Sequence, residues 1–145
     1  MEETQEKTKE QEYLEQLQRL QADFINYRNR MEKELQSIKE ASKDKLLKEF
    51  LEVKDNFERI PHKDQGIEMI YKQMETIFQK ENVEEITETK YNPELHEAIA
   101  TAAGEEDAII QITRKGYTRN GKILRPTQII LGKHEKNKTD HSANE

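Results

Sequence analysis

Residues 11–60 decide the fold, and they read QEYLEQLQRLQADFINYRNRMEKELQSIKEASKDKLLKEFLEVKDNFERI. This stretch contains neither proline nor glycine, so no residue in it must interrupt a helix. Its large apolar residues recur mostly at intervals of three and four, the spacing of one face of an α-helix. The members of this apolar stripe are Leu14, Leu17, Leu20, Phe24, Tyr27, Met31, Leu35, Ile38, Leu46, Phe50, Val53, Phe57 and Ile60. The stretch therefore predicts one long helix of roughly 75 Å, at about 1.5 Å per residue.

The apolar stripe repeats with a period longer than a heptad. An interval of eleven residues separates Phe24 from Leu35 and recurs to Leu46 and Phe57. An eleven-residue repeat keeps a straight or slightly right-handed seam facing a partner helix. Because one helix of this length cannot bury its own stripe, we expect a homodimer through a long paired helix, a dimeric coiled coil.

The stripe widens toward the end of the stretch. No large apolar residue occurs in residues 39–45, and Leu47 and Leu51 then join the stripe. A wide apolar face requires more than one neighbour. Pro61 ends the long helix, and Asp64 is placed to cap a second one. In a dimer, two long helices and two second helices predict a four-helix bundle.

The second helix is expected within residues 61–82, with Gly66 in its first turn. Two interpretations of Gly66 are open, namely tolerance of a glycine beside a helix cap and close approach of another chain. Asn82 is a plausible left-handed stop for this helix.

Residues 83–132 have the pattern of a small β domain, so the predicted fold class is α+β. Residues 91–94, YNPE, place Asn at a cap and Pro at the first helical position, which predicts one or two helical turns through His96 and Ala98. Runs of β-branched residues then predict strands, and the pair Asn120-Gly121 predicts a tight hairpin.

Composition narrows the function classes. Of the 145 residues, 37% are charged and 32% hydrophobic, and the net charge of −6 argues against binding to nucleic acid or an anionic membrane. There is no cysteine, and no apolar run approaches transmembrane length. Residues 1–10 and 133–145 are polar and predict a disordered lead-in and tail. The acidic start resembles no secretory signal, so we expect a cytoplasmic protein.

Catalytic and metal-binding patterns are absent from the sequence. The four histidines, His62, His96, His134 and His141, are not at ligand spacing, so we expect no metal. No nucleophile motif or phosphate-binding glycine loop occurs, and we expect the carboxylates to lie on solvated helix faces. We therefore predict neither an enzyme nor a cofactor. The local basic cluster of Arg28, Arg30 and Lys33 fits either a solvated face or a contact with an acidic partner.

Two separated segments carry a family resemblance. The segment YNPELHEAI at residues 91–99 is followed, after sixteen residues, by GYTRNGKILRP at residues 116–126. Together they resemble the C-terminal signature of the GrpE family, nucleotide-exchange co-chaperones of the DnaK-type heat-shock chaperone. Shorter stretches agree, and they are LQADF at 20–24, NYR at 26–28, DNFER at 55–59 and GIE at 66–68.

The resemblance implies a fold and a function. It implies a parallel long-helix dimer, a four-helix bundle and a β domain that docks on the chaperone's ATPase domain, opens the nucleotide cleft and releases ADP. It also implies a heat-responsive co-chaperone. The partner-binding positions that it implies are Arg28, Gly66, Tyr91, Pro93, Thr113 and Leu131. The alternative is a structural coiled-coil adaptor without exchange activity.

Overall fold

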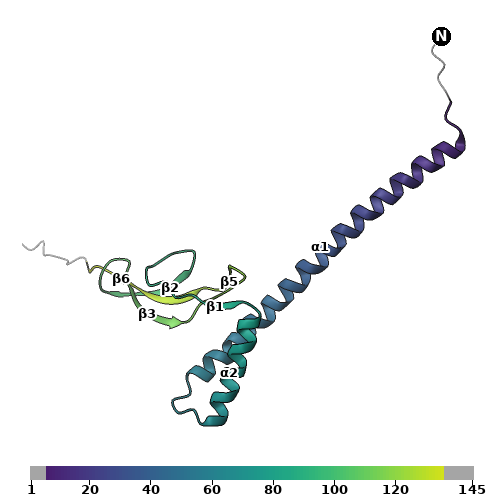
Figure 1. The fold of residues 1–145 in the computed structure, drawn as a ribbon. Helices are drawn as coiled ribbons and strands as arrows, with labels where there is room; N and C mark the ends of the chain where they lie inside the picture. The colour runs from purple at the N-terminus through teal and green to yellow at the C-terminus, as the bar shows by residue number, and fades with distance from the viewer. Residues whose placement is uncertain (1–5, 136–145) are drawn as a thin grey trace, which may run out of the picture. The chain divides into compact units, whose positions relative to one another are not determined.

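The computed structural model describes residues 6–135, in which two helices and six strands follow one another along the chain (Figure 1). They are α1 (Lys9–Glu58), α2 (Gln65–Lys80), β1 (Val83–Glu85), β2 (His96–Ala103), β3 (Ile109–Arg114), β4 (Tyr117–Arg119), β5 (Lys122–Arg125) and β6 (Thr127–Lys133). The chain divides into two compact units, Met1–Lys43 and Asp44–Glu145. The predicted disorder at residues 1–5 and 136–145 lies outside the described residues, and α1 already includes Lys9 and Glu10.

The predicted long helix is confirmed, and it continues without a break through the apolar gap at residues 39–45. In the first unit, most of its stripe side chains remain exposed. Leu17, Leu20, Phe24 and Leu35 are 61–66% exposed. Apolar side chains in regular helical register would gain about 25 cal/mol for each Å² that a partner covered. This part of α1 therefore presents an apolar seam that it does not bury within the described chain.

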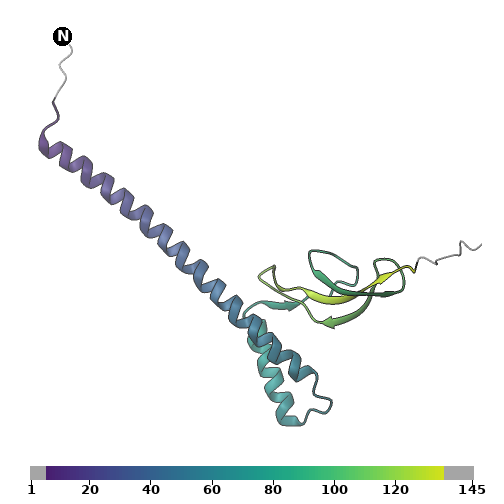
Figure 2. The ribbon, with the colours of Figure 1, turned by 180° about the vertical axis from the view of Figure 1, so that it is seen from behind.

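The second unit has its own core. Asp64 caps α2 as expected, because its side chain accepts the Ile67 N–H at 2.8 Å. Asn82, with φ of 58°, adopts the left-handed conformation predicted for it, just beyond the helix. Figure 1 and the reverse view in Figure 2 show α2 returning beside the last turns of α1. The core that joins these helices to β1, β4 and β5 contains Leu47, Leu51, Phe78, Val83, Tyr117 and Leu124.

The strands form two three-stranded sheets. Sheet A has the order β1-β4-β5 and is antiparallel. Sheet B has the order β2-β6-β3, in which β6 runs parallel to β2 and antiparallel to β3 (β6 is yellow in Figures 1 and 2). The predicted hairpin is confirmed between β4 and β5, where Asn120 and Gly121 have φ of 51° and 78°.

One prediction about the β region needs correction. No helix follows Pro93, because a single turn closes there and β2 begins at His96. The carbonyl of Asn92 accepts the N–H groups of Leu95 and His96, and the chain then enters sheet B, where His96 pairs with Thr127. Strand β1 lies at the start of the predicted β domain and was not itself predicted. It pairs with β4 and begins sheet A.

Candidate functional site

Sheet B brings together two of the predicted partner-binding residues. Thr113 lies on β3 and its hydroxyl donates to the Gln128 carbonyl of β6 at 3.1 Å. Leu131 lies on β6, and its register partners are Thr101 on β2 and Ile109 on β3. The two residues come from neighbouring strands, so the sheet supplies one rigid support for both.

Tyr91 and Pro93 lie in the turn that leads into β2. Tyr91 is half-buried and Pro93 is exposed. Four hydrogen bonds close this turn around Asn92. The Asn92 side-chain Oδ1 accepts the Glu94 N–H at 3.0 Å, and the Asn92 carbonyl accepts the N–H groups of Leu95 and His96. The Asn92 N–H donates to the His96 imidazole. Because Thr127 N–H donates to the Leu95 carbonyl at 3.0 Å, the turn is fastened to the first residue of β6.

Sheet B also carries exposed apolar side chains. Ile99 on β2 and Ile110 and Ile112 on β3 are 45–51% exposed. Ile112 pairs with Ile129, which lies two residues from Leu131 on the central strand. Exposed apolar side chains that form a contiguous patch mark protein–protein contacts. We call this group of three isoleucines the sheet B patch.

The other two predicted partner-binding residues lie on the helices. Arg28 belongs to the first unit, is largely exposed and forms an i,i+4 ion pair with Glu32 at 3.4 Å. Gly66 lies in the first turn of α2, where a Cβ would meet only Asp64 Oδ1, at 3.4 Å, which is ordinary contact. Both interpretations of Gly66 thus stay open, and the partner role of both residues stays a prediction.

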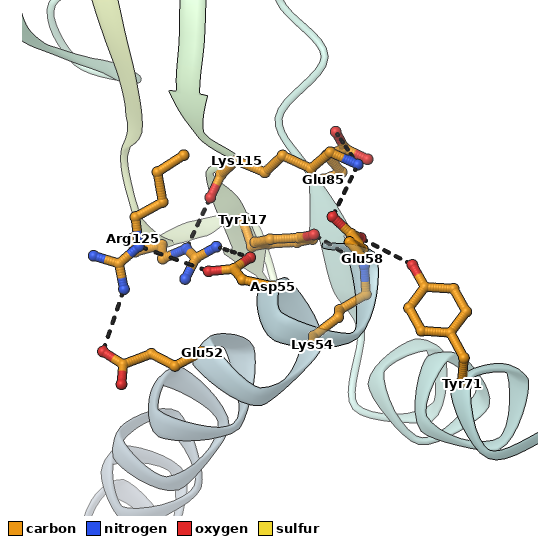
Figure 3. A network of polar contacts seen from close by, with 10 residues as sticks. Glu52, Lys54, Asp55, Glu58, Tyr71, Glu85, Lys115, Tyr117 and Arg125 are labelled. Atoms are coloured by element: carbon orange, nitrogen blue, oxygen red, sulfur yellow. Dashed lines mark hydrogen bonds and ion pairs between the residues drawn. The ribbon is translucent and has the colours of Figure 1, made fainter. Parts of the chain in front are cut away.

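A polar junction joins the end of α1 to sheet A in the second unit (Figure 3). At its centre is Lys54, which is 7% exposed. Its ammonium donates to the Tyr117 hydroxyl and to Glu58, both at 2.9 Å. The Tyr71 hydroxyl of α2 donates to the same Glu58 carboxylate at 2.8 Å, and Lys115 lies 3.3 Å from that carboxylate. Both helices and the strand region therefore meet at Glu58.

Arginines extend the polar junction on both sides. Arg125, buried on β5, donates to Asp55 at 2.7 Å and to the Lys115 carbonyl at 2.8 Å. Arg119, buried on β4, donates to Asp44 at 2.7 Å and to Glu81 at 3.2 Å. A guanidinium that is taken out of water needs several acceptors to offset its lost hydration. Each of these two arginines has acceptors in more than one segment, so each ties a strand of sheet A to α1.

The polar junction changes the acid–base properties of its members. Burial opposes the charged form of Glu58, but hydrogen bonds from Lys54 and Tyr71 outweigh it and hold the Glu58 pKa below its usual value. Burial also opposes the charged form of Lys54, yet the bonds to Tyr117 and Glu58 raise the Lys54 pKa. Burial raises the Tyr117 pKa. The charged pair and the neutral phenol are thus the stable forms at neutral pH.

Comparison with known proteins identifies the family of this chain. A model of the GrpE family matches residues 1–133. The chain belongs to the GrpE family. A protein named Protein GrpE from Fusobacterium nucleatum subsp. nucleatum is 40% identical over 129 residues, which cover 79% of this chain and 65% of that protein. This chain therefore spans slightly less than two thirds of that relative's length.

More distant relatives with the same name also match. Protein GrpE from Alkaliphilus oremlandii is 36% identical over 81% of this chain and 71% of its own length. Protein GrpE from Methanosphaera stadtmanae is 34% identical over 85% of this chain and 78% of its own length. The resemblance noted in the two signature segments is thus confirmed over most of the chain.

The fold explains why the GrpE signature has two parts. The turn formed by the first segment ends at His96. The second segment ends at Pro126, immediately before Thr127. His96 and Thr127 are register partners in the parallel pair of β2 and β6. A Cβ on Gly116 would overlap the backbone nitrogen and hydroxyl of Thr127, so only glycine fits beside this contact. The two segments are therefore neighbours in space.

The polar junction was missed in the sequence analysis. The carboxylates of α1 were expected on solvated faces, which is wrong for Asp55 and Glu58, whose side chains are 16% and 20% exposed and ion-paired. One signal was available, because Lys54 follows Leu47 and Leu51 at helical spacing on the same face. A charged residue on an apolar face indicates a buried partner. The basic partners lie far along the chain, and no local pattern marks them.

Neither a metal site nor a membrane span is apparent in the part of the chain that the structure describes. Within residues 6–135, no group of three or more His, Asp or Glu side chains is arranged to hold a metal ion. No helix in that range is long and apolar enough to cross a membrane.

Proposed function

We propose that this chain is a nucleotide-exchange co-chaperone that acts in the cytoplasm as a parallel homodimer. In this proposal the β domain docks on the ATPase domain of a DnaK-type chaperone, opens its nucleotide cleft and releases ADP. Membership of the GrpE family supports the co-chaperone role. The exposed seam of α1 supports the homodimer, because a second copy would supply the missing neighbour.

The mechanism requires binding and no covalent step. A partner that binds the open cleft more tightly than the closed cleft shifts the population toward the open state, in proportion to that difference in affinity. A rigid docking surface is suited to this task, because little of its binding energy is lost in ordering it. Sheet B provides such a surface, since Thr113 and Leu131 lie on paired strands and the Pro93 turn is hydrogen-bonded on both sides.

The sheet B patch is the observation that carries the proposal. Ile99, Ile110 and Ile112 are about half exposed and lie on the same sheet as Thr113 and Leu131. Buried apolar anchors carry a disproportionate share of the energy in protein interfaces. We therefore expect the patch to become buried against the chaperone.

The decisive experiment measures release of labelled ADP from a DnaK-type chaperone with and without this protein. Ile112→Asp places a charge in the sheet B patch. We expect this substitution to reduce the affinity of the protein for the chaperone by roughly 100-fold. Ile123→Asp is the matched control, because Ile123 is an isoleucine of similar exposure, 43%, on the other sheet. We expect the control variant to accelerate ADP release from the chaperone as much as the wild type does. Tyr91→Ala and Leu131→Asp should abolish release and leave the dimer intact.

The alternative is a coiled-coil adaptor that contacts no nucleotide-bound partner. It predicts that the wild-type protein leaves the ADP release rate unchanged at saturating concentration. Equal loss of activity in Ile112→Asp and Ile123→Asp would argue that the charge disturbs folding and not docking. Circular dichroism of both variants separates these cases.

A further inference from the structure

The turn at residues 91–95 depends on a single side chain for one of its hydrogen bonds. The Asn92 carbonyl already accepts two N–H groups, from Leu95 at 3.0 Å and from His96 at 2.8 Å. The Asn92 N–H points the other way and meets Nδ1 of His96 at 2.9 Å. A backbone N–H without an acceptor in a partly buried place is costly, so this contact contributes to holding the turn closed.

This contact defines the state of the imidazole. Nδ1 of His96 lies 3.1 Å from the Asn92 carbonyl as well as 2.9 Å from the Asn92 N–H. If Nδ1 carried a proton, the Asn92 carbonyl, which already accepts two N–H groups, would receive a third donor. That proton would also face the Asn92 N–H. Without that proton, Nδ1 accepts the N–H and satisfies it. Satisfying the Asn92 N–H through Nδ1 thus requires the tautomer with its proton on Nε2.

The ring of His96 is itself held in place. His96 is 4% exposed and is the register partner of Thr127 at the start of the pairing between β2 and β6. The Tyr91 ring lies against it, with centroids 6.1 Å apart and planes tilted by 35°. The imidazole therefore contacts the two residues that precede the exposed Pro93, and sheet B anchors its backbone.

We propose that His96 is a positioning residue of the docking surface, whose Nδ1 holds the Asn92 N–H and so fixes the turn that presents Tyr91 and Pro93. This inference rests on the proposed function, because it takes that turn as part of the surface that meets the chaperone. His96 itself is too buried to contact a partner. Its effect is to keep the turn in its bound shape before docking, which lowers the cost of binding.

Two substitutions separate the hydrogen bond from the bulk of the ring. His96→Leu keeps an apolar side chain in the buried site and removes the acceptor. His96→Asn restores an acceptor, because its Oδ1 occupies a place close to that of Nδ1. We expect His96→Leu to raise the amide exchange rate of Asn92 and the concentration for half-maximal ADP release by roughly 10-fold each. The maximal release rate should not change, and His96→Asn should recover most of the loss.

The experiment uses the full chain and has three readouts. A nitrogen–proton NMR spectrum of the wild type should show the His96 proton on Nε2. Amide exchange across β6 should be equal in all variants, which establishes that sheet B is folded. A proton on Nδ1 overturns the proposal. So does a His96→Leu protein with wild-type half-maximal concentration, or a His96→Asn protein as weak as His96→Leu.

Failure of the proposed function would look different. If Leu131→Asp abolishes release while His96→Leu behaves like the wild type, the docking function stands and the role of His96 is wrong. If the wild-type protein does not accelerate ADP release from the chaperone, the proposed function is wrong. The docking role of His96 is then overturned with it. In that case the NMR spectrum and the Asn92 exchange rate still decide whether His96 fixes the turn.

Discussion

Lys54 shows how one residue can join three segments. It occupies a position on the buried face of α1 where the spacing from Leu47 and Leu51 would suit an apolar side chain. Its ammonium lies over the Tyr117 ring, 5.0 Å from the centroid, and over the Tyr71 ring at 5.6 Å. Aromatic faces and two hydrogen bonds together compensate for the lost hydration of the charge.

Removing this ammonium should weaken the second unit. We expect Lys54→Ala to lower the free energy of unfolding by about 2 kcal/mol, because Glu58 and the Tyr117 hydroxyl lose a buried partner. The matched control is Lys48→Ala on an exposed face of the same helix, which should change stability by less than about 0.5 kcal/mol. Denaturant unfolding of both variants measures the difference. Equal effects would mean that the polar junction contributes nothing beyond helix propensity.

Glu58 should give the second unit a dependence on acid. Its pKa is lower in the folded state than in the unfolded chain, so its contribution is fully present above the unfolded value, about 4.3. The contribution is lost as pH falls from there through the folded pKa. We predict that Glu58→Gln flattens the fall of stability between about pH 5 and pH 3. Thermal melts across this range test the prediction, and an unchanged slope would contradict it.

At the scale of elements, α1 is uniform in backbone and uneven in its apolar stripe. The helix is continuous, yet residues 39–45 carry no large apolar side chain. Ser42 occupies the position that Leu20 and Met31 fill in the preceding eleven-residue repeats. A seam between two copies would bury little area at this point, and local opening is easiest where least area is buried.

Filling this gap should make the paired helix more resistant to heat. We predict that circular dichroism of the wild type shows a reversible loss of helix before the β domain unfolds. Ser42→Leu should raise that first transition and preserve exchange activity at temperatures where the wild type loses it. Ser37→Leu adds the same side chain away from the stripe and should not raise it. One cooperative transition in the wild type, or equal effects of both substitutions, would rule out this account of heat response.

At the scale of the whole molecule, the stripe predicts an assembly of two chains. Sedimentation at micromolar concentration should give the mass of a dimer. Replacing Leu17 and Phe24 together by Asp should produce monomers, because two charges would then face an apolar seam. Gln18→Asp, on the opposite face of α1, is the matched control and should remain a dimer. A wild-type monomer would contradict the pairing of α1 altogether.

Features that depend on neighbouring residues could be predicted from the sequence alone. The long helix, the Asp64 cap, the left-handed Asn82 and the Asn120-Gly121 hairpin were all predicted, and the structure confirms them. Each depends on side-chain periodicity or on backbone preferences within a few residues, and both are local properties of the sequence. The family resemblance likewise came from two short segments.

Contacts between distant residues, in contrast, depend on the complete fold. The turn at Pro93 was predicted to continue as a helix, because its local pattern suits a helix start; pairing of His96 with Thr127 made the following residues a strand instead. The partners of Arg119 and Arg125 on α1 are 75 and 70 residues away. Contacts over such separations are selected by the burial and charge of the complete fold, and a local sequence pattern contains no record of them.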